Sequence, residues 1–382
     1  MRITGDWLTS ENTQAVLGML TAADYQAYAV GGCVRNALLS VPVSDIDIAT
    51  DALPEEVVSL AENSRLKAIP TGIEHGTITV ICNGEPFEIT TFRKDIETDG
   101  RRATIAFSDN IYEDAIRRDF TVNALYVEAD GTLHDPLNGF ADIEERRIRF
   151  IEDATKRIEE DYLRILRFFR FTAWYGNPDT GLDAEGLAAC AAHVEGIHTL
   201  SKERLGAEMK KLLAAPDPAR ALSAMASSGV LAQVLPGSDP QFLAPLVFLE
   251  QSADIAPSWQ RRMVALGGEG QAKRLRLSKA EAKQLDTAKR ALQSGEPAAI
   301  IAYRYGADAA LDAKLIEAAS LSSPLPSSLI QDINKGSAAK FPVRGADLIK
   351  RLGAGPHLGK ELSRLKELWI TSDFKLDKKD LL

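Results

Sequence analysis

Two aspartates, Asp45 and Asp47, are separated by a single residue in the segment 44–48. A strand here places both carboxylates on one face, because side chains alternate between the two faces of a strand. Carboxylates a few ångströms apart repel each other unless a cation lies between them, and oxygen ligands suit Mg²⁺ that carries substrate phosphates. Glu88, in the middle of the predicted strand 87–92, is a candidate third carboxylate. The spacing predicts a metal site, whereas an Asp-x-Asp pair taken alone is more often a solvated strand edge.

A glycine pair precedes these acids. Gly31-Gly32 follows a short apolar run, residues 27–30, and Gly32 lies thirteen residues before Asp45. Backbone N–H groups at glycines approach an anion closely, and the N-terminus of the helix predicted next favours negative charge. Arg35 adds a planar guanidinium that suits phosphate. The glycines alone indicate a plain turn, but together with the two aspartates they predict a phosphate-binding turn beside a metal site.

More charged residues follow in the same part of the chain. The stretch 94–102 is charged and contains Gly100, which predicts a mobile loop rather than a packed element. Arg117-Arg118-Asp119 precedes the predicted strand 121–128 and either orients phosphates or forms a surface ion pair. Asn123, between apolar residues, is a candidate contact for a ribose hydroxyl.

A third pattern lies in the predicted helix 160–170. Asp161 and Arg164 fall along one side of that helix, with Arg167 one turn further on. A carboxylate accepts from an exocyclic amine and a guanidinium donates to a ring nitrogen or carbonyl, so the pair can imitate a Watson–Crick edge. The alternative interpretation is an i, i+3 salt bridge on a solvated helix, and the pair alone favours it.

The elements that must position these residues change along the chain. Up to about residue 145 the pattern is mixed, with strands predicted at 27–30, 77–82, 87–92 and 121–128 and helices at 34–39 and 54–62. Asn83-Gly84 joins two of these strands as a predicted hairpin turn. From about Asp153 onward, apolar residues follow i, i+3, i+4 spacing and strand signals almost disappear.

Composition limits the possible classes of protein. The 382 residues are 45% apolar and 26% charged, typical of a globular protein, and no apolar run approaches a membrane span. Three separated cysteines and a polar N-terminus predict a cytoplasmic protein without disulfides. The net charge of −9 restricts nucleic-acid binding to local basic surface. Segments 261–290 (net +6) and 341–382 (net +3) supply such charge, or else are ordinary solvated helix faces.

Four motifs of this sequence resemble, in their order and spacing, those of a known protein family. Gly-Gly-x-x-Arg, Asp-x-Asp, Arg-Arg-Asp-Phe-Thr-x-Asn-Ala and Glu-Asp-x-x-Arg resemble those of the class II template-independent nucleotidyltransferases. This family contains bacterial tRNA CCA-adding enzymes and bacterial poly(A) polymerases. Segments 135–149, 201–208 and 345–359 resemble its linking, neck and tail motifs, so the match covers nearly the whole chain. Asn36 departs from the pattern, since Asp commonly follows that arginine, whereas Asp45 and Asp47 are intact.

The resemblance implies an α+β fold, with a polymerase-beta-like nucleotidyltransferase head followed by an elongated all-helical neck, body and tail. It implies four domains: the head at 1–145, a neck with a nucleobase-reading helix at 146–215, a body at 216–270, and a tRNA-binding tail at 271–382.

The resemblance also implies a reaction and its residues. A tRNA 3′-hydroxyl attacks the α-phosphate of CTP twice and then of ATP, releasing pyrophosphate, with Asp45 and Asp47 holding Mg²⁺ and Glu88 as a further catalytic candidate. Nucleotide-binding roles fall on Gly32, Arg35 and Arg118 at the phosphates or sugar, on Asp161 and Arg164 at the base, and on Arg167 and Arg170 in the rest of the pocket. The expected partners are tRNA, CTP and ATP, with no membrane and no protein partner.

Alternatives stay open at this point. A poly(A) polymerase of the same family often has a strongly basic C-terminal extension, whereas this sequence ends soon after Lys378-Lys379. An enzyme that adds only CC is disfavoured by the predicted loop at 94–102. A catalytically inactive RNA-binding module is disfavoured by the intact acidic pair.

Overall fold

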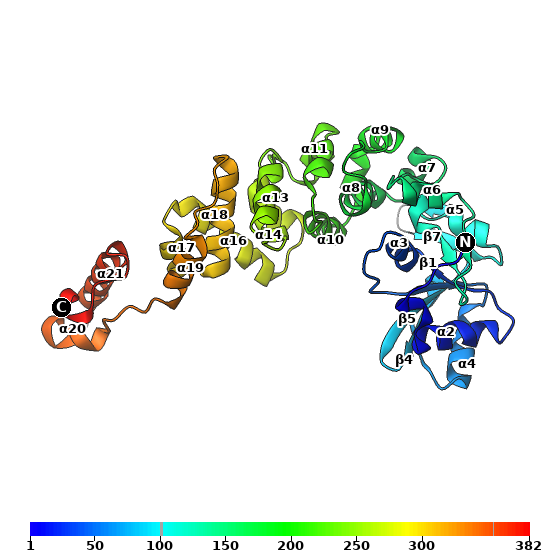
Figure 1. Ribbon diagram of the computed structural model, residues 1–382, viewed down its shortest axis with the longest axis horizontal. Coiled ribbons are helices and arrows are strands. Elements are labelled where there is room, and N and C mark those ends of the chain that lie inside the picture. Colours follow the sequence, from blue (N-terminus) through cyan, green and yellow to red (C-terminus); the bar gives the residue numbers. More distant parts are fainter. Residues whose placement is uncertain (100–101, 354) are drawn as a thin grey trace. The chain divides into compact units, whose positions relative to one another are not determined.

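The computed structural model describes residues 1–99, 102–353 and 355–382. The chain forms two compact units, Met1–Val234 (unit 1) and Leu235–Leu382 (unit 2), and Figure 1 shows the elements of each. Unit 1 contains the sheet and its associated helices, and unit 2 is helical throughout its described residues. None of the described helices is long and apolar enough to cross a membrane.

Unit 1 is built on a seven-stranded sheet with the strand order β3-β4-β5-β2-β1-β8-β9. Neighbouring strands run antiparallel except β2 and β5, which are parallel. Helices α2 (Glu11–Thr21) and α4 (Pro54–Asn63) pack on the sheet, and α3 (Gly32–Leu38) follows β1 directly (Figure 1). The strands are β1 Ala27–Val30, β2 Asp47–Thr50, β3 Lys67–Gly72, β4 Thr77–Cys82, β5 Glu85–Thr91, β8 Tyr126–Val127 and β9 Leu133–His134.

The hairpin predicted at Asn83-Gly84 is confirmed. These two residues join β4 and β5, and their φ angles are 50° and 87°. Two central residues with positive φ match the right-handed twist of the flanking strands, and glycine and asparagine tolerate that conformation best. The turn fixes the β4–β5 register, which brings β5 alongside β2.

The prediction of a loop at 94–102 is wrong. β6 (Arg93–Asp99) and β7 (Arg102–Phe107) form a separate antiparallel ribbon, with Arg93 opposite Phe107 and Asp99 opposite Arg102. Residues 100 and 101 lie outside the described residues. Charge and glycine content led to the loop prediction, but two strands satisfy each other's backbone groups by pairing and need no apolar pattern to do so.

The strand predicted at 121–128 is mostly wrong. Thr121–Asn123 is a 3₁₀ turn, and β8 contains only Tyr126–Val127. Asp119 accepts hydrogen bonds from the backbone N–H of Phe120 and from the side chain of Asn123, at 2.9 Å each. Local side-chain hydrogen bonds of this kind compete with a strand ladder.

The acidic segment also begins its strand later than predicted. β2 starts at Asp47, so Asp45 lies in the preceding segment, where its carboxylate accepts from the Ser44 hydroxyl at 3.1 Å. The two carboxylates therefore do not share one face of a regular strand.

The helical part of unit 1 packs on the sheet region through aromatic residues. Phe120 contacts Phe168 and Phe171 of α8, and Phe150 contacts Phe168, with ring centroids 5.1–6.4 Å apart. The helix α8 in turn packs against α10 and α11. The elements are α5 Ile111–Ile116, α6 Gly139–Glu144, α7 Ala154–Glu160, α8 Leu163–Tyr175, α9 Ala184–Ala192, η3 Val194–Thr199, α10 Lys202–Leu213, α11 Ala219–Ser227 and α12 Val230–Val234.

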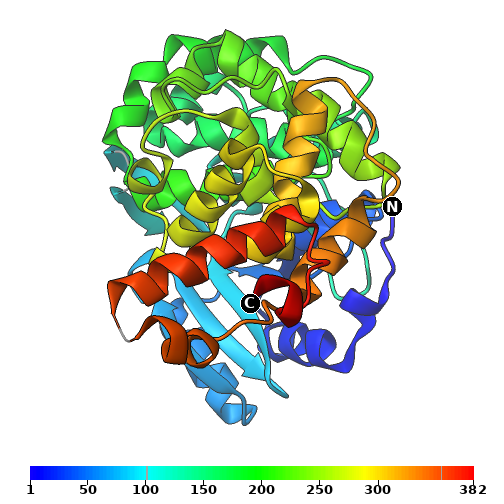
Figure 2. The same ribbon diagram turned by 90° about the vertical axis from the view of Figure 1, so that its left-hand side faces the viewer.

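Unit 2 confirms the predicted loss of strands for its described residues. One core lies among α16 to α19, and a second gathers Trp369, Tyr303 and Phe374 near the C-terminus. Figure 2 shows α21 beside α20 and the short α22. The helices are α13 Leu243–Ser252, α14 Trp259–Leu266, α15 Gln271–Arg274, α16 Lys279–Ser294, α17 Ala298–Tyr305, α18 Ala307–Ser320, α19 Leu329–Ala338, α20 Gly345–Leu352, α21 Pro356–Thr371 and α22 Lys378–Leu381.

Candidate nucleotide-binding site

A cavity of about 480 Å³ lies in unit 1, between the sheet region and the helices that follow it. Seven of the residues predicted from sequence line it: Gly32, Arg35, Asp47, Arg118, Asp161, Arg164 and Arg167. Three others, Asp45, Glu88 and Arg170, are not among its lining residues. Four further lining residues also belong to the motifs found in the sequence: Gly31, Arg117, Asp119 and Asn123, the candidate ribose contact. The sequence analysis did not single out the remaining three, Leu163, Phe171 and Arg204, as site residues. Its walls hold six arginines and three aspartates, which suits an anionic ligand.

The turn that forms one wall of the cavity requires glycine for a steric reason. Gly31 has φ +73°, and a Cβ there would lie 3.4 Å from the Nη1 atom of Arg118. A side chain at this position would be strained and would crowd that guanidinium. Gly32 then begins α3, so the backbone of the turn itself forms part of the cavity wall.

Two of the acidic residues lie on neighbouring parallel strands, Asp47 at the start of β2 and Glu88 in the middle of β5. Asp47 on β2 and Glu88 on β5 are directly opposite each other. Desolvation raises the pKa of Asp47, and the nearby Glu88 and Asp45 carboxylates raise it further against the opposing effect of Arg118. Among the described residues, no group of three acidic, histidine or cysteine side chains is arranged to hold a metal ion. A crowded aspartate pair nevertheless fits Mg²⁺, which proteins often bind through one or two carboxylates together with substrate phosphates.

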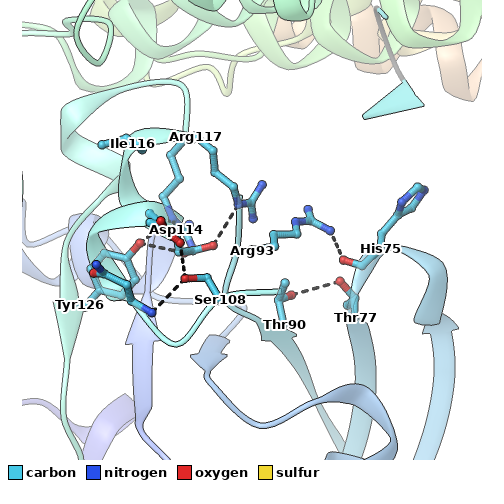
Figure 3. A network of polar contacts seen from close by, with 12 residues as sticks. His75, Thr77, Thr90, Arg93, Ser108, Asp114, Ile116, Arg117 and Tyr126 are labelled. Atoms are coloured by element: carbon cyan, nitrogen blue, oxygen red, sulfur yellow. Dashed lines mark hydrogen bonds and ion pairs between the residues drawn. The ribbon is translucent and has the colours of Figure 1, made fainter. Parts of the chain in front are cut away.

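Asp114 was missed by the sequence analysis. It is 1% exposed and accepts hydrogen bonds from Arg117 Nε at 3.0 Å, Arg118 Nη2 at 2.8 Å and the Tyr126 hydroxyl at 2.8 Å (Figure 3). Burial alone would raise the pKa of Asp114, but the two guanidinium groups hold it well below its usual range. Asp114 therefore fixes both arginines at the cavity wall. Its i, i+3 and i, i+4 spacing from them is a signal that could have revealed it.

Asp119 joins the two walls. One carboxylate oxygen accepts from Asn123 at 2.9 Å, and the other accepts from Arg167 Nε of α8 at 2.7 Å. Burial opposes ionisation, but Arg167 and the Asn123 amide outweigh it and lower the pKa of Asp119 to about 2. The aspartate of the Arg-Arg-Asp motif is thus an internal anion that holds Asn123 and Arg167 in place.

Asp161 and Arg164 both line the cavity, but the salt bridge between them is absent. The predicted helix is interrupted: α7 ends at Glu160, Asp161 is extended, and α8 begins at Leu163. Arg204 donates to Asp161 at 2.6 Å, and Arg164 donates to Glu160 at 2.5 Å. The continuous helix predicted over residues 160–170 is therefore wrong, and so is the alternative of an i, i+3 salt bridge between Asp161 and Arg164.

Arg170 and Arg93 lie outside the cavity lining. Arg170 is 2.6 Å from the buried Glu208 carboxylate and stacks on the Phe171 ring, with its guanidinium carbon 4.6 Å from the centroid. Arg93, at the start of β6, donates to the backbone carbonyl of His75 (Figure 3). That contact ties the root of the β6–β7 ribbon to the segment between β3 and β4.

Comparison with known families gives the class of protein. Residues 27–149 match a family model described as the poly A polymerase head domain, and residues 181–242 match one described as a probable RNA and SrmB-binding site of polymerase A. The first match spans the glycine turn, the acidic pair and Arg118. The head domain, with its arginine-rich cavity, places the chain among the nucleotidyltransferases.

Whole-chain relatives are more specific. CCA tRNA nucleotidyltransferase 1, mitochondrial, of Mus musculus is 31% identical over 98% of this chain and 90% of its own length. A CCA-adding enzyme of Streptococcus pyogenes is 42% identical over 55% of this chain and 51% of its own. The Bacillus stearothermophilus CCA-adding enzyme, solved in complex with CTP, has a TM-score of 0.72 at 27% identity, covering 95% of this chain and 93% of that one. This chain belongs to the family of CCA tRNA nucleotidyltransferases.

Proposed function

We propose that this chain adds the 3′-terminal CCA to tRNA, using CTP and ATP bound in the cavity of unit 1. The observation that carries the proposal is the convergence of residues from all four sequence motifs, from Gly31 to Arg164, on one cationic cavity. Under this proposal residues 1–145 form the catalytic head, 146–215 the base-reading neck, 216–270 the body and 271–382 a tail that binds tRNA. We further propose the cytoplasm as its location; the relatives include mitochondrial enzymes.

Asp45 and Asp47 would hold the divalent cation, for which Mg²⁺ is our proposal. When bound, Mg²⁺ stabilises the attacking and leaving oxygens of a phosphoryl transfer. The nearness of the Glu88 and Asp45 carboxylates to Asp47 supports this assignment, because neighbouring carboxylates ionise together more easily when a cation is present. Glu88, opposite Asp47 on the neighbouring strand, adds negative charge beside it.

The chain's own groups would orient the two reactants. Gly32, Arg35 and Arg118 would hold the nucleotide's phosphates and sugar, so that the tRNA 3′-hydroxyl attacks the α-phosphate and pyrophosphate leaves. No side chain acts as a nucleophile. Catalysis then consists of positioning and electrostatic stabilisation.

Asp161 and Arg164 retain free hydrogen-bonding capacity to read a base. The two carboxylate oxygens of Asp161 accept from Leu163 N and Arg204 Nη2, whereas an ionised carboxylate has about four acceptor sites. Arg164 donates to Glu160 and to the backbone carbonyls of Arg157 and Arg117, which occupies three of about five guanidinium donors. The remaining acceptors and donors match the edge that C and A share. Arg167 and Arg170 would complete the pocket around that pair.

The test is to sequence the 3′ ends of a tRNA that lacks its terminus, after incubation with Mg²⁺ and CTP, ATP or both. We expect CC with CTP alone and CCA with both nucleotides. A run of adenosines would identify a poly(A) polymerase, an arrest at CC would identify a CC-adding enzyme, and unchanged tRNA that still binds would identify an inactive RNA-binding module.

A further inference from the structure

The six arginines of the cavity differ in their partners. Five form an ion pair with a carboxylate: Arg117 and Arg118 with Asp114, Arg164 with Glu160, Arg167 with Asp119, and Arg204 with Asp161. Arg35 is the exception among the described residues, since no carboxylate lies within ion-pair distance of it. Arg35 follows the glycine turn and is buried, with only 6% of its surface exposed.

Neutral groups hold Arg35 instead. Its Nη2 donates to the Tyr175 hydroxyl at 3.0 Å and to Asn36 Oδ1 at 2.8 Å, and its Nη1 donates to Asn123. The guanidinium carbon also lies 4.1 Å from the centroid of the Tyr175 ring and 5.1 Å from that of Phe171. Tyr175 therefore contacts Arg35 twice, through its hydroxyl and through the face of its ring.

A buried guanidinium without a carboxylate needs other groups to fix its orientation. Its Nε is buried without a hydrogen-bond partner, so Asn36, Asn123 and Tyr175 supply all the hydrogen bonds the structure gives it. Asn36 cannot act as a counter-ion, because its amide is neutral. Its amide nitrogen donates to the backbone carbonyl of Pro42 at 3.0 Å. A cation–π contact with a hydrogen bond to the same side chain both stabilises and orients an arginine.

We propose that Tyr175, the last residue of α8, is a positioning residue that anchors Arg35 for the phosphates of incoming CTP and ATP. Tyr175 takes the place that a carboxylate takes for the other five arginines. This inference rests on the proposed function, because it assigns the phosphates of that reaction's nucleotides to Arg35. It also links the glycine turn of α3 to α8, 140 positions further along the chain.

Two substitutions separate the ring from the hydroxyl. Tyr175→Leu removes both contacts, and Tyr175→Phe removes the hydroxyl alone. We expect KM for CTP and for ATP to rise about tenfold in Tyr175→Leu and about threefold in Tyr175→Phe, with kcat within about threefold of wild type. Trp174→Phe is the matched control, since its indole N–H donates to the carbonyl of Lys211 and not to Arg35; its KM values should not change.

A rescue variant tests the anchoring role itself. Asn36→Asp places a carboxylate where an amide oxygen now accepts from Arg35 at 2.8 Å, which would supply the missing ion partner. In the Tyr175→Phe background, Asn36→Asp should restore both KM values to within about twofold of wild type. A purely structural tyrosine would not respond in this way, because the two side chains would then contribute independently.

The outcomes distinguish this inference from the proposed function. If wild type adds no nucleotides to tRNA, the proposed function fails. If wild type is active but Tyr175→Leu keeps wild-type KM values, or loses thermal stability and kcat with KM unchanged, the anchoring role is wrong. Failure of Asn36→Asp to restore Tyr175→Phe would also overturn it.

Discussion

Arginines buried against carboxylates occur in both units, but they are enclosed to different degrees. In unit 2, Arg261 and Arg262 are 4% and 0% exposed. Both donate to Glu250, at distances of 2.7–3.0 Å, and Arg261 also donates to Asp312 at 2.7 Å. Arg262 and Glu250 are enclosed, whereas Arg261 and Asp312 also line a separate cavity of about 620 Å³. The two positive and two negative charges of the cluster balance without any ligand.

In unit 1, five of the six cavity arginines pair with a carboxylate, and Arg118 does so on one side only. Arg118 turns its Nε and Nη2 toward Asp114, while its Nη1 lies near Gly31 at the cavity wall. Pairing with a carboxylate is therefore no mark of function by itself. The difference lies in whether donors remain on the side that faces the cavity, because those donors can bind an anion and enclosed ones cannot.

The largest expected effect is the loss of either aspartate of the acidic pair, of which Asp47 lines the cavity. Asp45→Ala or Asp47→Ala should reduce nucleotide addition to below about 1% of wild type, since removing one charge-stabilising group typically lowers the rate by ~10²–10³. The measurement is CTP incorporation into tRNA, with tRNA binding and thermal unfolding as controls that should change little. More than about 1% residual turnover in either variant would contradict the metal assignment.

The enclosed arginines of unit 2 should show the opposite behaviour. Arg262→Met leaves Glu250 with one partner fewer in a dry site, and we expect the free energy of unfolding of unit 2 to fall by about 3–5 kcal/mol. Chemical denaturation measures this, and the activity of folded enzyme should remain. Arg290→Met is the matched control, because its ion pair with Asp286 is exposed and should contribute less than about 1 kcal/mol. If Arg262→Met abolished nucleotide binding while stability held, the contrast between the two units would be wrong.

This contrast was only partly predictable from the sequence. Arg261 and Arg262 were counted among the basic surface of 261–290, because a charge count cannot show that Glu250 and Asp312 fold over them. Contacts between distant residues, such as Arg204 with Asp161 and Tyr175 with Arg35, were equally out of reach.

Local patterns were more informative. The Gly-Gly turn, Asp47, Arg118 and the Asp161–Arg164 pair were found because each is a short motif, and all of them line the cavity. Errors in the fold arose where hydrogen bonds outweigh apolar pattern, in the β6–β7 ribbon and the turn at Thr121–Asn123. The α+β class and the helical second half depend on long periodic stretches and were confirmed.

Base selection is the next test of the cavity. UTP and GTP carry a carbonyl at the position where CTP and ATP carry the amine from which the Asp161 carboxylate would accept. Asp161→Ala should therefore lose discrimination against UTP and GTP as well as activity. Arg164→Ala should have the same effect. The mismatch costs on the order of 1–3 kcal/mol, a tenfold to hundredfold bias. A four-nucleotide incorporation assay measures it. Glu159→Ala, on α7 beside His193 and outside the cavity lining, should keep the preference. Wild-type preference in both cavity variants would move selection to the bound RNA or the β6–β7 ribbon.

The smallest expected effect concerns exposed basic residues of unit 2. Arg274 and Arg276 flank the end of α15 and Lys279 begins α16, and all three are exposed. Replacing all three with glutamine should weaken tRNA binding and reduce the slope of log K against log salt by about two to three, since each lost phosphate contact releases roughly 0.7–0.9 fewer counterions. Filter binding at several salt concentrations measures the slope. Exchanging lysine and arginine at the same three positions retains the charge and should retain the slope. If the glutamine variant also keeps the wild-type slope, the tRNA contact lies elsewhere, with the segment 341–382 as the next basic surface to test.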